Sequence, residues 1–135
     1  MPAIDLKIGD VKKTGCLAIE SAQAKASTLI AKATQVCNDG NGFVPATASL
    51  AATYKVHLAL DDVAAAQADR GFRVLVRGLA VAKLPGNLAA FKKGRKFTVG
   101  TTAGNLVLAS SATDIIVCEA YEDTVANATE AIVRY

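Results

Sequence analysis

Residues 71–83 (GFRVLVRGLAVAK) constrain the fold more than any other part of the chain. Up to Val76 the large apolar side chains fall on even-numbered positions, as expected for a strand with one buried face. After Gly78 they fall on odd-numbered positions, beginning with Leu79. A glycine at such a switch predicts a β-bulge or a sharp bend at Gly78, where the strand changes the face that it buries.

Strand-like patterns continue on both sides of this segment. Further strands are predicted at residues 15–20, 28–36, 53–60, 96–99, 105–109, 114–121 and 130–135. Turn-forming residues lie at 38–42 and 100–104, and the second of these turns predicts a hairpin. About eight short strands linked by such turns are typical of an all-β barrel or sandwich.

Helix-forming sequence is scarce. Residues 61–68 predict one or two helical turns, because Asp61 or Asp62 can cap a run rich in alanine. A single turn is predicted at residues 88–91, and the polar, weakly periodic residues 1–14 predict an extended N-terminal arm. We therefore expect one all-β domain at residues 15–135, a small barrel or sandwich with at most one short helix.

Composition argues for a soluble chain and against a membrane segment. Hydrophobic residues make up 52% of the sequence, aromatic residues 5%, and the formal net charge is +3. The longest charge-free stretch, between Lys96 and Asp114, has 17 residues and is rich in Thr, Ser and Gly. A membrane-spanning helix needs about 20 mostly apolar residues. Asp5 and Asp10 also interrupt the N-terminus where a secretory signal would be apolar.

The three cysteines, Cys16, Cys37 and Cys118, form no metal-type pair and leave one thiol over if two of them pair. Free cysteine is among the most buried residue types. We expect these three residues to be buried as small hydrophobic side chains in a protein kept in a reducing compartment.

Charge is segregated along the chain. Residues 70–113 carry eight basic side chains and no acidic one, namely Arg70, Arg73, Arg77, Lys83, Lys92, Lys93, Arg95 and Lys96. Residues 114–130 carry five acidic side chains and no basic one, namely Asp114, Glu119, Glu122, Asp123 and Glu130. Two interpretations stay open: the blocks steer one face of the molecule toward a charged partner, or they pair as neighbouring strands and cancel.

The basic cluster KKGRK at residues 92–96 lies between Phe91 and Phe97, which raises the question of nucleic-acid binding. Against it, the isoelectric point is only 8.8, and the sequence has neither an RNP-type aromatic motif nor zinc-knuckle spacing. A solvated loop, or a loop that meets an acidic protein surface, is the better interpretation.

The sequence gives no signal of catalytic chemistry. With His57 as the single histidine, a histidine metal cluster cannot form, and no Ser or Cys nucleophile is placed beside it. Its strand position predicts an exposed or interface histidine. Asp61, Asp62 and Asp69 lack the spacing and glycine of a calcium loop, and residues 40–42 lack the rest of a phosphate-binding loop. We expect no enzyme activity, no metal and no cofactor.

From residue 42 onward the sequence resembles the small capsid decoration, or cement, proteins of tailed bacteriophages. The resemblance follows PATASLAATYKVHLALDD (45–62), FRVLVRGLAVAKL (72–84), FKKGRKFTVGTTAGNLVLAS (91–110), DIIVCEAYED (114–123) and EAIVRY (130–135). Its matching motifs are Arg77-Gly78-Leu79, the segments 94–99 and 119–123, and the closing segment 131–135.

This resemblance implies a β-rich, β-tulip-like domain without catalytic residues. It implies binding to the outer surface of an expanded icosahedral head, with the major capsid protein as partner, after assembly in the host cytoplasm. The oligomer implied is a homotrimer or a homodimer. The N-terminal region of such proteins often reaches across a neighbouring subunit, and here the arm candidates are Ile4, Leu6 and Ile8.

Exposed basic residues are expected to meet the acidic outer surface of a capsomer. The candidates for this capsid contact are Arg73, Arg77, Lys92, Lys93, Arg95 and Lys96. The alternative is a small β-barrel module that binds a carbohydrate, a peptide or nucleic acid. Such a module would call for a cluster of aromatic residues, and the seven aromatics of this chain are spread along it.

Overall fold

Short antiparallel strands dominate the computed structural model, which describes residues 11–12, 17–67 and 71–135. The strands are β1 (Val11–Lys12), β2 (Ala18–Gln23), β3 (Gln35–Asn38), β4 (Phe43–Pro45), β5 (Val56–Ala59), β6 (Gly71–Arg77), β7 (Leu79–Lys83), β8 (Lys96–Val99), β9 (Leu106–Leu108), β10 (Cys118–Ala120) and β11 (Glu130–Arg134). The helices of the described part are α1 (Ala48–Ala51) and the 3₁₀ turn η1 (Ala65–Gln67). The expected all-β fold is confirmed.

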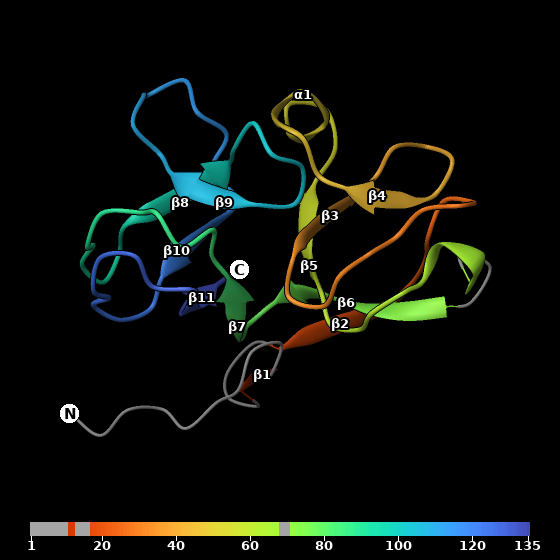
Figure 1. Ribbon diagram of the computed structural model, residues 1–135, viewed down its shortest axis with the longest axis horizontal. Coiled ribbons are helices and arrows are strands. Elements are labelled where there is room, and N and C mark those ends of the chain that lie inside the picture. Colours follow the sequence, from red (N-terminus) through yellow and green to blue (C-terminus); the bar gives the residue numbers. More distant parts are fainter. Residues whose placement is uncertain (1–10, 13–16, 68–70) are drawn as a thin grey trace.

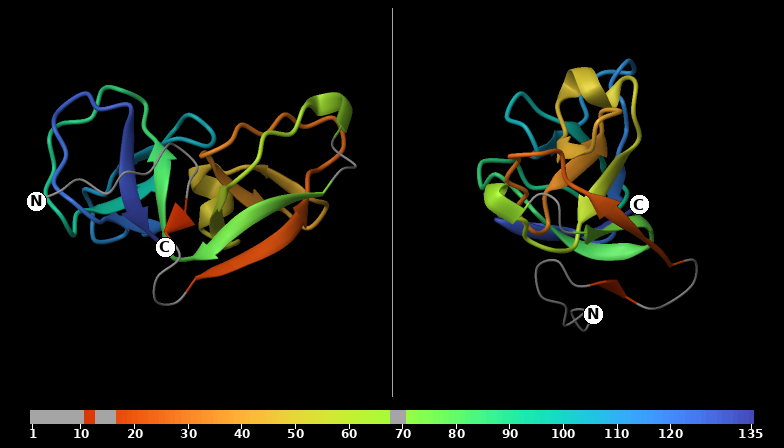
Figure 2. Two further views of the ribbon diagram at one scale, coloured as in Figure 1. Left: turned by 90° about the horizontal axis from the view of Figure 1, so that it is seen from below. Right: turned by 90° about the vertical axis from the view of Figure 1, so that its right-hand side faces the viewer.

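The strands form two sheets that lie side by side along the long axis of the molecule (Figures 1 and 2). A six-stranded sheet has the order β1-β7-β11-β10-β8-β9, and a five-stranded sheet has the order β2-β6-β5-β3-β4. The five-stranded sheet curls until its two edges meet, because Ala24, just after β2, forms a parallel bridge with Phe43 of β4. The curled sheet therefore encloses an apolar interior of its own.

Gly78 joins the two sheets. It lies between β6 in one sheet and β7 in the other, with φ +135°, a backbone conformation that favours glycine. A Cβ atom at this position would lie 2.9 Å from Leu17 Cδ1. Next to it, Ala18 pairs with Arg77 and Ile19 with Leu75, so β6 carries one extra residue. Of the two alternatives predicted at Gly78, the structure has the bend, while the bulge lies two residues earlier, at Val76. Figure 2 shows the chain turning sharply between β6 and β7.

Three apolar cores fill the described part of the molecule. The largest contains Leu58 and Leu75 from the five-stranded sheet together with Phe97 and Val133 from the six-stranded sheet, so it joins the two sheets. A second core lies inside the curled sheet and includes Phe72. The third core consists of Cys37, Ala46, Ala51, Val56 and Val99, and it fixes α1 and the end of β8 to the five-stranded sheet.

The helices differ from expectation. Instead of a helix at 61–68 there is only η1, because both aspartates bind elsewhere: Asp61 accepts hydrogen bonds from Arg73, and Asp62 accepts one from the backbone N–H of Lys32. The one α-helix of the described residues, α1, was not expected. Thr47 caps it by accepting a hydrogen bond from the N–H of Leu50. Residues 88–91 form no helical turn.

Several strand boundaries also differ. The strand expected at 114–121 shrinks to β10, because Asp114 accepts hydrogen bonds from the N–H groups of Ser110 and Ser111 and thereby holds residues 110–114 in a turn. The strand expected at 28–36 begins only at Gln35, and β2 continues through residues expected to be a connection. Strand β5 is shorter than residues 53–60, since α1 and a turn precede it. The hairpin β8–β9 is confirmed.

Most of the expected N-terminal arm, including Ile4, Leu6 and Ile8, lies outside the described residues. Within it, β1 pairs with β7 through Val11 and Ala80 and through Lys12 and Leu79. None of the helices in the described ranges is long and apolar enough to cross a membrane.

Candidate interaction surface

Part of the basic block of the sequence is compensated by carboxylates within the chain: Arg73, Lys92 and Lys96 each form an ion pair. Strand β8 lies beside β10, which places Lys96 opposite Glu119. The Lys96 ammonium group forms an ion pair with the Glu119 carboxylate, and Arg134 Nε lies 3.6 Å from the same carboxylate. The pKa of Glu119 is lowered, chiefly by the hydrogen bond from Lys96. In this sheet the opposed blocks cancel each other, as the second interpretation of the sequence predicted.

The same cancellation occurs in the loop before β8. Lys92 Nζ lies 3.5 Å from Asp123 Oδ2, and the backbone N–H of Lys93 donates to Asp123 Oδ1 at 2.8 Å. These contacts, the backbone hydrogen bond first, lower the pKa of Asp123. The Lys93 ammonium group lies 5.1 Å from the ring centre of Tyr121, within reach of a cation–π interaction. Arg95 donates to the carbonyl of Ala109 at 2.8 Å.

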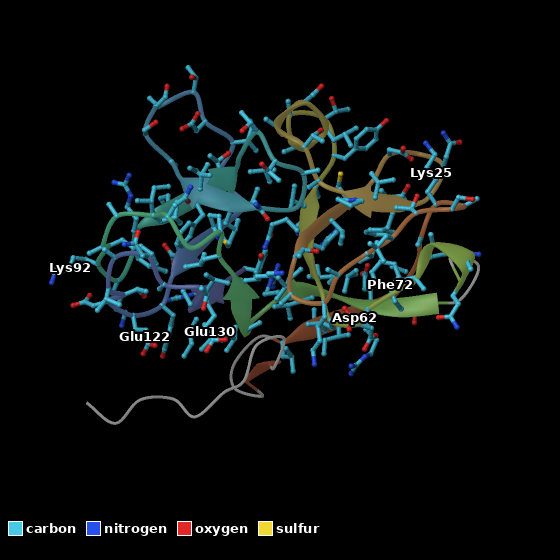
Figure 3. The ribbon with its side chains drawn as sticks, viewed as in Figure 1. Lys25, Asp62, Phe72, Lys92, Glu122 and Glu130 are labelled. Atoms are coloured by element: carbon cyan, nitrogen blue, oxygen red, sulfur yellow. The ribbon has the colours of Figure 1, made fainter. Side chains whose placement is uncertain are left out.

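The two remaining capsid-contact candidates lie on the other sheet. Arg73 in β6 forms a two-pronged hydrogen bond with Asp61, at 3.1 and 2.8 Å. This contact lowers the pKa of Asp61. Arg77, at the end of β6, is exposed. Figure 3 shows Phe72, the neighbour of Arg73, far from Lys92 along the molecule. The six candidates therefore form two separate groups, not one basic patch.

Groups that could react are largely buried. Cys37 and Cys118 are free and buried, as expected, and Cys16 lies outside the described residues. Burial raises the pKa of the Cys118 thiol to about 12 and also raises the pKa of Cys37. Since the thiolate is the nucleophile and metal ligand, neither thiol is activated. The described ranges contain no group of three or more His, Cys, Asp and Glu side chains that could hold a metal ion.

His57 is half-buried in β5, less exposed than its position in the sequence suggested. Its ring lies 6.1 Å from that of Phe43, and Nδ1 is buried without a hydrogen-bond partner in the described structure. Burial, assisted by the nearby charge of Lys55, lowers the pKa of His57. The neutral imidazole is therefore the form that the fold favours.

A buried polar contact crosses between the two sheets. Gln35, at the start of β3, is fully buried, and its Oε1 accepts a hydrogen bond from the Tyr135 hydroxyl. Burial raises the pKa of Tyr135 well above its ordinary value. The backbone of Tyr135 also exchanges two hydrogen bonds with Gly78, at 2.9 and 3.3 Å. These contacts fix the joint between the sheets and offer no accessible reactive group.

A surface that was not predicted from the sequence lies at the top of Figure 1, where the β9–β10 loop, the β8–β9 turn and α1 follow one another from left to right. The same three segments lie at the top in the right-hand view of Figure 2. We call their exposed residues the neutral cap: Ala48, Ser49, Ala52, Thr53, Tyr54, Thr101, Thr102, Ala103, Ser110, Ser111, Ala112, Thr113, Ile115 and Ile116.

The neutral cap comes from two charge-free runs, residues 40–54 and 97–113, followed by two exposed isoleucines. These runs were available in the sequence, where the second served only to exclude a membrane helix. Ile115 and Ile116 are 44% and 47% exposed. A shallow hollow of about 410 Å³, lined by Ser110, Ser111 and Ile116 together with residues 94–96, lies where the cap borders the basic residues.

In comparisons with known proteins, the chain matches no family model and no curated protein.

Proposed function

We propose that this chain is a capsid decoration, or cement, protein that binds the outer surface of an icosahedral phage head and stabilises the shell by non-covalent contacts. The observation that carries the proposal is where the motifs of the sequence resemblance lie. Residues 77–79 lead into β7, residues 94–99 include β8, residues 119–123 include part of β10, and residues 131–135 include most of β11. These four strands are consecutive neighbours in the six-stranded sheet. These four motifs therefore lie in one contiguous structural unit, whereas other stretches of the resemblance, such as residues 45–62, belong to the five-stranded sheet.

The proposal also agrees with the physical requirements of a cement protein. A cement protein must grip a rigid shell through a wide contact, with many copies acting together. Joining several weak contacts in one oligomer raises the overall affinity by roughly two to four orders of magnitude. The proposed partners are accordingly the major capsid protein and further copies of this chain, as a homotrimer or a homodimer. The proposed location is the outer capsid surface, reached from the host cytoplasm during assembly.

The test is cosedimentation of the purified chain with undecorated, expanded heads built from the capsid protein of the same phage. We expect saturable binding with a fixed number of copies per head, and native mass spectrometry should give a stable trimer or dimer. Absence of binding to such heads would refute the proposal. Unexpanded heads of the same capsid protein are the matched control, since decoration proteins of this class bind the expanded shell.

One observation favours the alternative, a small binding module. The five-stranded sheet nearly closes into a barrel, and Phe43 lies against both Phe72 (5.7 Å between ring centres) and His57. The interior of a small β-barrel is a common place for ligands. A strict monomer in native mass spectrometry, together with ligand-dependent shifts of Phe43 and His57 resonances, would favour the module over the cement protein.

A further inference from the structure

We infer that the neutral cap, and not the basic residues, is the face that lies against the capsid, and that its counterpart on the shell is an uncharged protein surface. This inference rests on the proposed function and assigns the contact within it. It replaces the electrostatic contact expected from the sequence with a contact made by apolar and hydroxyl-bearing side chains.

Charge is unevenly distributed over the described surface. Near β8 and β10, cations already have partners within the chain, such as Glu119 for Lys96 and Asp123 for Lys92. A capsid carboxylate would have to compete with these partners. In the neutral cap, by contrast, all fourteen exposed side chains are uncharged. Depletion of charge marks the buried centre of protein interfaces, because an unpaired charge is costly to remove from water.

Asp114 is the charged residue of the β9–β10 loop. Its Oδ2 atom accepts hydrogen bonds from the backbone N–H groups of Ser110 and Ser111, at 2.8 and 3.0 Å. The carboxylate is thus satisfied by the loop itself and orders it. A partner can cover this loop without having to supply a counter-charge. The two isoleucines that follow are held with their side chains exposed.

Two of the three cap segments are held rigidly together. The β8–β9 turn is bonded to the chain before α1 and to β3 through main-chain hydrogen bonds: Gly104 N–H to the Ala46 carbonyl at 2.8 Å, and Gln35 N–H to the Gly104 carbonyl at 3.0 Å. Below them, Ala51 of α1 and Val99 of β8 share one buried core. A surface that is already ordered loses little conformational entropy when it binds.

The shell surface that fits this face is itself uncharged. A charge placed opposite the cap would be desolvated without a partner, since the cap offers none. Ile115 and Ile116 would supply the apolar anchors, and the Ser and Thr hydroxyls would hydrogen-bond to main-chain or side-chain groups of the shell. Such a contact is predicted to depend weakly on salt, unlike one made by lysine and arginine.

The experiment measures binding of three variants to the same expanded heads. Ile116→Glu places a charge on the cap, at the hollow where the cap borders Arg95 and Lys96. Val125→Glu is the matched control, because Val125 is an apolar residue, 76% exposed, outside the cap. Lys92→Glu combined with Lys93→Glu reverses the basic loop. All four positions are exposed, and circular dichroism spectra and unfolding midpoints verify that each variant folds.

We expect Ile116→Glu to weaken binding by roughly tenfold or more, while the other two variants and a rise in salt from about 0.05 to 0.5 M change it by less than about threefold. Normal binding of Ile116→Glu would overturn the inference, as would strong loss in the lysine variant or with salt, and the proposed function would survive either result. Failure of the wild-type chain to bind would overturn both.

Discussion

The two sheets of this protein differ in how their strands find their neighbours. In the six-stranded sheet, opposite charges face each other across adjacent strands, with Lys96 beside Glu119 and Lys83 beside Glu130. In the five-stranded sheet the strands are matched by apolar side chains on the curled inner face, such as Phe72 and Val74, and the edges are joined by one bridge. Charged pairs therefore add to the pairing of strands in the first sheet, on top of its apolar core, whereas packing and backbone geometry dominate in the second.

The largest effect is expected when one phenylalanine is removed from each of two cores. Phe97, fully buried, belongs to the core shared by both sheets, whereas Phe72 belongs to the core inside the curled sheet. We expect Phe97→Ala to lower the free energy of unfolding by about 3–5 kcal/mol and Phe72→Ala to lower it by a smaller amount in that range. Urea denaturation followed by circular dichroism gives both values. A larger loss for Phe72→Ala would mean that the shared core is not the main support of the fold.

The next largest effect on stability is expected when Gly42, directly before β4 of the curled sheet, is replaced by alanine. Gly42 has φ +135°, and a Cβ there would lie 2.7 Å from the backbone of Lys25, which leads to the closing bridge. We expect Gly42→Ala to cost up to about 3 kcal/mol. Gly94 is the matched control in the other half: its φ is +90°, but a Cβ there would have no neighbouring atom within 4 Å.

For Gly94→Ala the expected cost is only about 1–2 kcal/mol, from the backbone conformation alone. Thermal unfolding of both variants measures the difference. Equal losses of stability in the two variants would show that the close approach of Gly42 to the Lys25 backbone contributes nothing to the cost of the alanine.

The dependence of stability on pH separates the two sheets further. The pKa of His57, in the five-stranded sheet, is lowered in the folded state, so folding favours its neutral form. Stability should be complete above its ordinary pKa of 6.5 and decline as the pH falls through the lower folded value. The carboxylates Asp61 and Glu119, whose folded pKa values are also lowered, lose their contribution only below about 4.

Unfolding midpoints between about pH 7 and pH 5 therefore report on His57. In His57→Phe, which fills a similar space without a titrating group, the decline in that range should disappear. If the decline persists in this variant, another group is responsible.

The smallest expected effect is that of the ion pair between the charged blocks. The Lys96 and Glu119 side chains are 54% and 26% exposed, so solvent screens their attraction. A double-mutant cycle with Lys96→Ala and Glu119→Ala should give a coupling energy of about 0.2–1 kcal/mol that falls as salt is added. The same cycle at Arg73 and Asp61 tests whether the five-stranded sheet gains as much from its two-pronged pair. A clearly larger coupling energy for Arg73 and Asp61 would show that ion pairing stabilises the five-stranded sheet more than the six-stranded one.

Features that depend on neighbouring residues in the chain were predictable from the sequence. The switch at Gly78 from even-numbered to odd-numbered apolar positions is a local feature of the sequence, and so is the turn that connects β8 to β9. Helix α1 was missed because four residues give almost no periodic signal, and the helix depends on the Thr47 cap and on packing against the end of β8. The apolar residues Ile115 and Ile116 suggested a strand, but a side-chain contact of Asp114 three to four residues back holds the preceding turn.

The candidate contact surface was harder to predict for a similar reason. The sequence shows that basic and acidic residues are segregated, but whether they cancel depends on which strands become neighbours, and β8 and β10 are separated by β9 in the chain. Likewise, the two charge-free runs become one surface only when the β8–β9 turn is bonded to Ala46 of the other sheet. Both results are products of long-range pairing, which no local pattern encodes.

The passage of one strand through both sheets also has a mechanical consequence. Because β6 and β7 are separated by Gly78 alone, a force that pulls the two halves apart is carried by the covalent backbone as well as by the shared core. Bending one half relative to the other would rotate the backbone at Gly78, strain its two hydrogen bonds to Tyr135 and open the shared core. Under load the two sheets should therefore respond as one body, and they should separate only when the shared core gives way.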